Sequence, residues 1–303
     1  MEILRTPDAR FADLPGFDVE PRYVEVERGD GSGMLRVAYV AAGPTDGPVV
    51  VCLHGEPTWS FLYRKVMAVL AADKCRVIVP DLVGFGRSDK PREMGDHTYA
   101  RHVEWMRSAL FGALDLRGVT LLAQDWGGLI GLRLLAENPD RFARVVAANT
   151  GLPDGTHDMP AVWHQFKDAV ASAPTLDISR FVTSGCRRPI DPVVVAAYDA
   201  PFPDESYKAG PRVMPQLIPT RPDDPAAISN RKAWQVLSTL DTPFLCAFSD
   251  GDPITGAMAG ILPKLIPGAA GQPHMTIRDA GHFLQEDAGE ELGRVVAEFV
   301  RAG

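Results

Sequence analysis

The feature that most constrains the fold is an apolar run that stops at one acidic residue and restarts at once as a helix. Residues Val119–Ala123 have the β-branched and aliphatic character of a buried parallel strand. Leucine then recurs at helical spacing at Leu129, Leu132 and Leu135. Asp125 lies at the corner, between small residues that a tight turn requires because bulkier ones would clash. The sequence therefore predicts a strand, a sharp turn and a helix.

This corner resembles the strand-to-helix elbow on which α/β-hydrolases carry their nucleophile, usually as the serine of G-x-S-x-G. An aspartate at that position can attack carbon directly and form an ester with the enzyme. Ordinary serine-esterase chemistry is thereby excluded. The alternative interpretation is that Asp125 only caps the helix, because aspartate is a preferred N-cap residue and an anion is stabilised at a helix N-terminus.

Composition limits the class of protein. A chain of 303 residues with 46% hydrophobic residues can form one large domain, or a domain with an insertion. The net charge of −8 and a pI near 5.4 argue against nucleic acid or an anionic membrane as partners. The N-terminus lacks the apolar segment of a signal peptide, and no segment is long enough to cross a bilayer. We therefore expect a cytoplasmic protein, and we expect a monomer.

The four cysteines are widely separated, and three of them lie in runs typical of buried strands. We expect reduced core residues at Cys52, Cys75, Cys186 and Cys246. Their spacing matches no zinc motif, so no metal site is predicted.

Strand and helix patterns alternate at both ends of the chain. Strands are expected at residues 23–27, 35–41, 49–53, 75–80, 119–123, 143–148, 243–248 and 275–278, the first two forming an antiparallel edge. Helices are expected at 99–116 and 286–301. Between residues 152 and 235 this alternation stops and proline recurs, which indicates an inserted cap of short helices. We predict an α/β-hydrolase fold with a mostly parallel eight-stranded sheet, a core domain of residues 1–153 and 236–303, and a helical cap domain of residues 154–235.

Further chemical groups follow the predicted strands. The loop His54-Gly55-Glu56-Pro57 resembles the element that supplies an oxyanion-hole amide in hydrolases, with a plain strand-to-helix turn as the alternative. Asp252 and His282 follow the last two strands, and Asp250 competes with Asp252 for the same role. The carboxyl ends of parallel strands meet at one edge of a sheet. Asp125, Asp252 and His282 thus follow the nucleophile, acid, base order of the α/β-hydrolase triad.

A set of motifs across nearly the whole chain completes this pattern. They are His54-Gly55-Glu56-Pro57-Thr58-Trp59-Ser60, Asp81-Leu82-Val83-Gly84-Phe85-Gly86-Arg87-Ser88-Asp89-Lys90-Pro91, Gln124-Asp125-Trp126-Gly127, Ala200-Pro201-Phe202-Pro203-Asp204 and Ala280-Gly281-His282-Phe283. In combination they resemble the haloalkane dehalogenases, in the branch whose triad acid follows the seventh strand. Each motif alone also occurs in epoxide hydrolases.

The resemblance implies hydrolysis of a small apolar haloalkane to a primary alcohol and a halide ion, with water as co-substrate and no cofactor. Asp125 would be the nucleophile, His282 the general base and Asp252 the triad acid. The backbone N–H groups of Glu56 and Trp126 would form the oxyanion hole. The indoles of Trp126 and Trp163 would bind the halide, because an indole N–H is a neutral donor embedded in apolar surface.

Three other functions remain open at this point. An epoxide hydrolase would use the same aspartate with cap tyrosines as proton donors, and Tyr198 and Tyr207 lie in the predicted cap. Against this, Glu56 stands where epoxide hydrolases usually carry an aromatic residue in the corresponding loop. A fluoroacetate-type dehalogenase would need arginines near the elbow, and none closely follows Asp125. A non-catalytic ligand-binding relative would typically lack a triad residue, whereas all three are present here.

Overall fold

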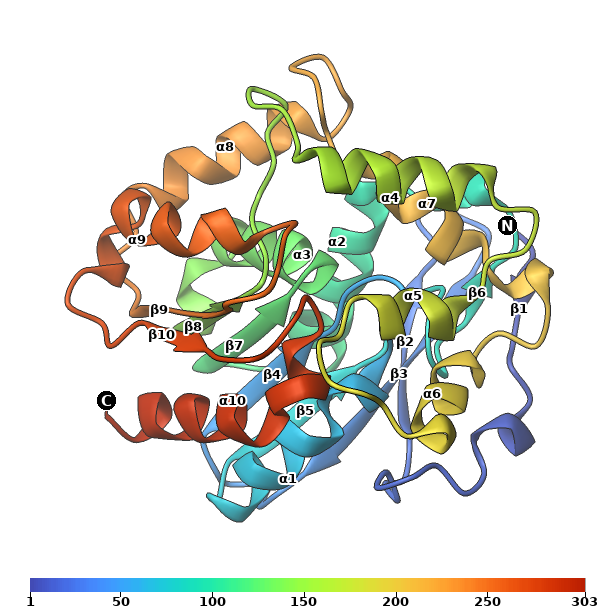
Figure 1. Cartoon of the computed structure of the whole chain (residues 1–303), viewed down its shortest axis with the longest axis horizontal. Coiled ribbons are helices and arrows are strands. Elements are labelled where there is room, and N and C mark those ends of the chain that lie inside the picture. The colour runs from blue at the N-terminus through green and yellow to red at the C-terminus, as the bar shows by residue number, and fades with distance from the viewer. Residues whose placement is uncertain (303) are drawn as a thin grey trace.

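A computed structural model describes residues 1–302, and its centre is a sheet of eight strands (Figure 1). In sheet order these are β10 (Met275–Ile277), β9 (Phe244–Ser249), β8 (Phe142–Ala148), β7 (Val119–Gln124), β4 (Val49–Leu53), β5 (Arg76–Pro80), β3 (Met34–Ala42) and β2 (Arg22–Glu27). Within the described part of this sheet, β3 alone runs in the opposite direction to the other strands, so its pairings with β2 and β5 are antiparallel and the rest are parallel. The predicted mostly parallel sheet with an antiparallel edge is confirmed.

Strand order places two of the predicted site loops side by side. The chain passes from β4 to β5 on one side and later returns to β7 on the other side of β4. Such a switch point leaves a crevice beyond the carboxyl ends of the two strands, where α/β folds bind ligands. The loop with Glu56 follows β4, and Asp125 follows β7.

Helices cover both faces of the sheet. α1 (Arg64–Ala72) and α10 (Leu284–Arg301) pack together on one face, while α2 (Tyr99–Arg107) and α3 (Trp126–Glu137) lie on the other (Figure 1). The short helix α9 (Leu262–Leu265) lies beside β9. Because successive strand residues point to opposite faces, Val51 and Leu53 enter one hydrophobic core and Val50 and Cys52 the other. Burial on both faces explains the continuous apolar runs of the central strands.

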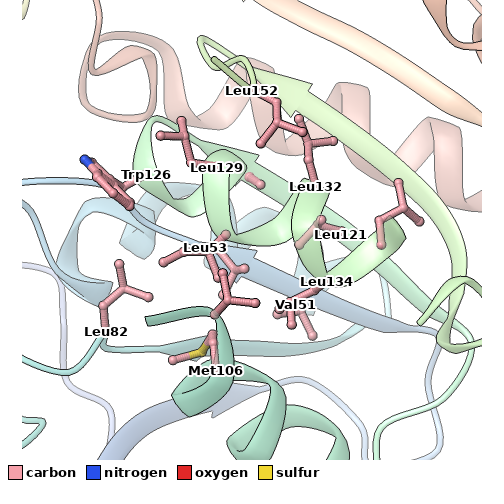
Figure 2. Close-up of a cluster of buried hydrophobic side chains, with 14 of the residues drawn as sticks. Val51, Leu53, Leu82, Met106, Leu121, Trp126, Leu129, Leu132, Leu134 and Leu152 are labelled. Atoms are coloured by element: carbon pink, nitrogen blue, oxygen red, sulfur yellow. The ribbon is translucent and has the colours of Figure 1, made fainter. Parts of the chain in front are cut away.

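The first of these cores joins the elbow helix to the sheet. Figure 2 shows Leu129 and Leu132 of α3 above Val51 and Leu53 of β4. A Cβ atom on Gly127 would overlap the Leu53 carbonyl group, so the first turn of α3 can lie this close to β4 only with glycine there. In the same figure the nitrogen of Trp126 points away from the cluster.

Two predicted helices differ from the structure in their bounds. The segment predicted as one helix over 99–116 ends its α-helical part at Arg107 and continues as a wider π-helical segment, Ser108–Ala113. Ala109, Leu110 and Phe111 are all buried, and the wider turn brings these consecutive side chains to the core. The C-terminal helix begins at Leu284 and has a kink at Ala288.

The segment between β8 and β9 forms short helices, as predicted. They are α4 (Ala161–Ser172), α5 (Ile178–Ser184), α6 (Pro192–Asp199), α7 (Ala209–Leu217) and α8 (Ala227–Leu237). Asp191 caps α6 through the Val193 N–H, with Pro192 in its first turn. The helices α4 and α7 lie side by side above the carboxyl edge of the sheet (Figure 1). α8 packs against α3, so the proposed cap boundary at residue 235 falls within a helix that contacts the core.

A small antiparallel sheet of β1 (Ile3–Leu4) and β6 (Lys90–Pro91) was not predicted from the sequence. Its strands are two residues long and carry no periodicity that a sequence pattern could reveal. Within residues 1–302, no helix combines the length and apolar character that crossing a membrane requires. The four cysteines are free, and three of them are buried.

Candidate active site

Asp125 forms the elbow between β7 and α3 in a strained backbone conformation, with φ 50° and ψ −127°. Its N–H donates to the Asn149 carbonyl (3.0 Å), and its own carbonyl accepts from the Gly128 N–H (2.9 Å). The side chain makes no capping hydrogen bond to the helix. A positive φ in a non-glycine residue stores strain that the surrounding structure must hold. The interpretation that Asp125 serves only to cap the helix is wrong, because its carboxylate makes no hydrogen bond to the helix N–H groups and instead accepts one from Glu56.

The Asp125 carboxylate faces the loop after β4. Its Oδ1 accepts a hydrogen bond from the Glu56 N–H at 2.8 Å. A Cβ on Gly55 would collide with the same carboxylate, so glycine is needed for this approach. The second predicted donor, the Trp126 amide, opens α3 and makes no hydrogen bond to Asp125 oxygens among the described residues. The structure thus brings one of the two predicted oxyanion-hole amides into contact with the carboxylate.

His282 lies in the loop between β10 and α10, with a carboxylate near each ring nitrogen. Nε2 lies 3.5 Å from Asp125 Oδ2, and Nδ1 lies 3.1 Å from Asp252 Oδ2. Burial alone would lower the pKa of His282, but the Asp252 and Asp125 carboxylates outweigh burial and raise the pKa to about 10. The imidazole is therefore positively charged between two anions near neutral pH.

The structure also distinguishes between the two candidate acids. The Asp252 side chain is fully buried beside His282 and accepts hydrogen bonds from the Ile254 N–H (2.9 Å) and from the Thr255 hydroxyl. Burial would raise the pKa of Asp252, yet His282 and these donors hold it below its usual range. Asp250 is partly exposed and lies 3.6 Å from Arg187. Asp252, as expected, is the acid that contacts the imidazole.

Two polar residues that the sequence analysis missed support this arrangement. Asn149 donates to the carbonyl of His282 (3.0 Å) and accepts from the Ser249 N–H (2.9 Å), which joins the ends of β8 and β9 to the histidine loop. The side-chain amide of Gln124 donates to the His282 carbonyl (3.2 Å) and lies 3.1 Å from Nε2. Gln124 ends β7 and Asn149 directly follows β8, so each is a polar residue at a strand end, and that signal was present in the sequence.

A cavity of about 310 Å³ opens above these groups, between the sheet edge and the cap. Asp125 and His282 line it together with mostly apolar side chains, among them Phe166, Phe181, Ile218, Ile254 and Phe283. The Glu56 side chain also faces this space. Burial, followed by the negative charge of Asp125, raises the pKa of Glu56 well above its usual range. Burial and the nearby Asp125 carboxylate therefore both disfavour the charged form of the Glu56 carboxyl group.

The five tryptophans fall into two groups. Trp59, Trp105 and Trp234 donate their indole N–H to the backbone carbonyls of Ala197, Arg28 and Leu152. Trp126 and Trp163 both line the cavity, and within residues 1–302 their indole N–H groups have no acceptor. The cavity therefore offers two neutral donors to a ligand that accepts hydrogen bonds.

The cap tyrosines are placed differently from what an epoxide hydrolase would need. Tyr198 is buried against Phe61, and its hydroxyl donates to Glu286 at 2.6 Å. Neither Tyr198 nor Tyr207 lines the cavity. One arginine that the sequence analysis did not consider, Arg187, does line it, and its side chain lies near Asp250 at the surface.

Comparison with known proteins agrees with this geometry. A profile of the family described as alpha/beta hydrolase fold matches residues 48–289. A haloalkane dehalogenase of Psychrobacter cryohalolentis is 51% identical over 300 residues, which cover 99% of this chain and 98% of the relative. Haloalkane dehalogenase 1 of Mycobacterium tuberculosis is also 51% identical, over the full length of both chains.

Solved structures are similar as well. A haloalkane dehalogenase from Paraglaciecola agarilytica, described as tetrameric, superimposes with a TM-score of 0.89 at 36% identity, covering 97% of each chain. The resemblance inferred from the motifs is confirmed by these full-length relatives. The chain belongs to the haloalkane dehalogenase family of the α/β-hydrolase fold.

Proposed function

We propose that the protein hydrolyses haloalkanes to a primary alcohol and halide through a covalent ester on Asp125. In the first step an Asp125 carboxylate oxygen attacks the carbon that bears the halogen. The new C–O bond forms as the C–halogen bond breaks, and the halogen leaves with the bonding electrons. The indole N–H groups of Trp126 and Trp163 stabilise the halide, because donors in a largely apolar cavity act where the charge develops.

In the second step water hydrolyses the ester. His282 takes a proton from a water molecule that attacks the Asp125 carboxyl carbon. The negative oxygen of the tetrahedral intermediate is held by the backbone N–H groups of Glu56 and Trp126. When the intermediate collapses, the C–O bond to the alcohol oxygen breaks and His282 returns the proton to that oxygen. The regenerated carboxyl group then loses a proton, so the reaction yields alcohol, halide and one proton.

The change in the charge of Asp125 supports the base role of His282. Before the reaction, two carboxylates raise the pKa of the imidazole, and a cation cannot accept a proton. Ester formation neutralises Asp125 and so removes one of the two negative charges beside the imidazole. The pKa of His282 therefore falls when the ester forms, and the ring becomes available as a base at the step that needs one.

The observation that carries this proposal is the pair of cavity-lining indoles without protein acceptors, next to an aspartate on the elbow. An epoxide hydrolase would need tyrosine hydroxyls in the cavity, and Tyr198 and Tyr207 lie outside it. We further propose that residues 154–235 act as a cap on a core of residues 1–153 and 236–303, and that the protein works as a cytoplasmic monomer.

The test is halide release from 1,2-dibromoethane and 1-bromobutane, measured beside diol formation from styrene oxide. Asp125→Asn should abolish bromide release. His282→Asn should release at most one bromide per active site and retain a butyl group on Asp125, which mass spectrometry of a proteolytic digest detects. Diol formation without bromide release, or bromide release that survives Asp125→Asn, would contradict the proposal.

A further inference from the structure

One charged side chain outside the catalytic groups contacts the proposed halide site without lining the catalytic cavity. Lys167 and Trp163 lie four residues apart on α4, so they are neighbours on one helix face. The Lys167 Nζ atom lies over the Trp163 ring, 5.3 Å from its centroid. Trp163 lines the catalytic cavity and Lys167 does not, so the ammonium group contacts the indole without itself lining the space for the substrate.

Lys167 instead lines a second cavity of about 560 Å³ between the cap and the start of α2. This space adjoins the catalytic cavity, because Ile218 lines both. The two arginines that line it are already paired, Arg133 with Glu137 and Arg221 with Asp224. Lys65 and Lys208 pair with carboxylates, whereas within residues 1–302 Lys167 pairs with none. Its charge is therefore not neutralised by a neighbouring side chain.

A cation over the face of an indole changes what the indole N–H can do. The positive charge is attracted to the electron-rich ring face and draws electron density from it. An N–H on an electron-poorer ring is a stronger donor to an anion. The positive charge also lies close to the ring without lining the catalytic cavity, so it attracts a halide bound at the indole without entering its binding site.

We propose that Lys167 is a positioning residue that strengthens halide binding through the Trp163 indole. The inference rests on the proposed function, because it assumes that Trp163 donates to the halide. Lys167 touches neither substrate nor the reacting atoms. It favours cleavage of the carbon–halogen bond and, for the same reason, slows the departure of the halide.

The test measures bromide binding directly, by quenching of tryptophan fluorescence at constant ionic strength. Lys167→Met should weaken bromide binding roughly two- to fivefold, as expected for loss of a partly exposed cation–π contact, while Lys167→Arg retains it. Lys264→Met is the matched control, because it removes the same charge from an exposed position on α9 that lines neither cavity. Thermal midpoints of all variants establish that they are folded.

A double-mutant cycle with Trp163→Phe separates this inference from the proposed function. If the charge acts through the indole, Lys167→Met should have no further effect in a Trp163→Phe background. The inference is overturned if Trp163→Phe weakens bromide binding but Lys167→Met does not. It is also overturned if Lys167→Met and the control Lys264→Met weaken bromide binding equally. If Trp163→Phe itself leaves bromide binding unchanged, the halide role of Trp163 fails and the inference fails with it. Ester formation on Asp125 in the His282→Asn variant tests the proposed function in either case.

Discussion

At the scale of single residues, the site depends on which carboxylate faces the imidazole of His282. Asp252 lies 3.1 Å from Nδ1, while Asp250 lies near Arg187 at the surface. A carboxylate at Nδ1 holds the ring in one tautomer and stabilises its charged form. Two aspartates only two residues apart therefore have different roles, because their side chains leave the same loop in different directions.

This difference predicts a selective effect of Asp252→Asn. Without the carboxylate, the pKa of His282 falls and the ring loses its fixed orientation. We expect ester hydrolysis to slow by about 10²- to 10⁴-fold. Ester formation should slow much less, so the alkyl-enzyme should accumulate in rapid-quench experiments followed by mass spectrometry. Asp250→Asn is the control and should leave both steps unchanged. If Asp252→Asn and Asp250→Asn slow ester hydrolysis equally, the effect comes from a disturbed loop and not from loss of the Asp252 charge.

At the scale of elements, the cap is joined to the core by a buried polar contact between α6 and the start of α10. The Tyr198 hydroxyl donates to Glu286, and Arg64 of α1 binds the same carboxylate through two nitrogens at 2.6 and 2.7 Å. Burial would raise the pKa of Glu286, yet Arg64 and Tyr198 hold it below its usual range. This network fixes the position of α6, which follows α5 and the helix that carries Trp163, α4.

Tyr198→Phe should therefore lower stability and leave the chemistry intact. A lost hydrogen bond to a charged group costs about 1.5–3 kcal/mol, and Arg64 still neutralises Glu286. Denaturant unfolding measures the stability change, and bromide release measures the chemistry. Tyr207→Phe is the control, because within residues 1–302 its hydroxyl makes no hydrogen bond. If a folded Tyr198→Phe protein loses turnover, this prediction is wrong and Tyr198 takes part in catalysis.

At the scale of the whole molecule, the charged imidazole links stability to pH. The folded-state pKa of His282 is about 10, whereas an unfolded histidine titrates near 6.5. Between these values the folded state holds a proton that the unfolded state has lost. The stabilisation from this group is complete below about pH 6.5 and is lost as the pH rises toward 10.

The thermal midpoint should accordingly fall more steeply between pH 7 and 10 in the wild-type protein than in His282→Asn. Other groups that titrate in this range are common to both proteins, so the difference between the two curves isolates His282. His157→Asn, at an exposed position, should follow the wild-type curve. Parallel curves for the wild type and His282→Asn would mean that His282 is not held charged in the folded protein. Calorimetry at closely spaced pH values provides the measurement.

The strands and the order of the candidate site residues along them were predictable from the sequence because they depend on local patterns. A buried parallel strand is a short apolar run, and the residue that follows it must lie at the carboxyl edge of the sheet. Asp125, Asp252 and His282 each follow such a run, so their convergence required no knowledge of distant contacts. The π-helical segment after α2 was missed because its widened turn depends on packing against the core.

What the sequence alone determined is thus the elbow, the parallel sheet around it and the loops that meet there. The tertiary structure decided the rest: that Asp252 and not Asp250 faces His282, that Tyr198 binds Glu286 outside the cavity, and that Lys167 lies over the Trp163 ring. These outcomes depend on the direction in which side chains project from the loops and from the helices of the cap. That direction is set by contacts between residues far apart in the chain, and local periodicity carries no record of them.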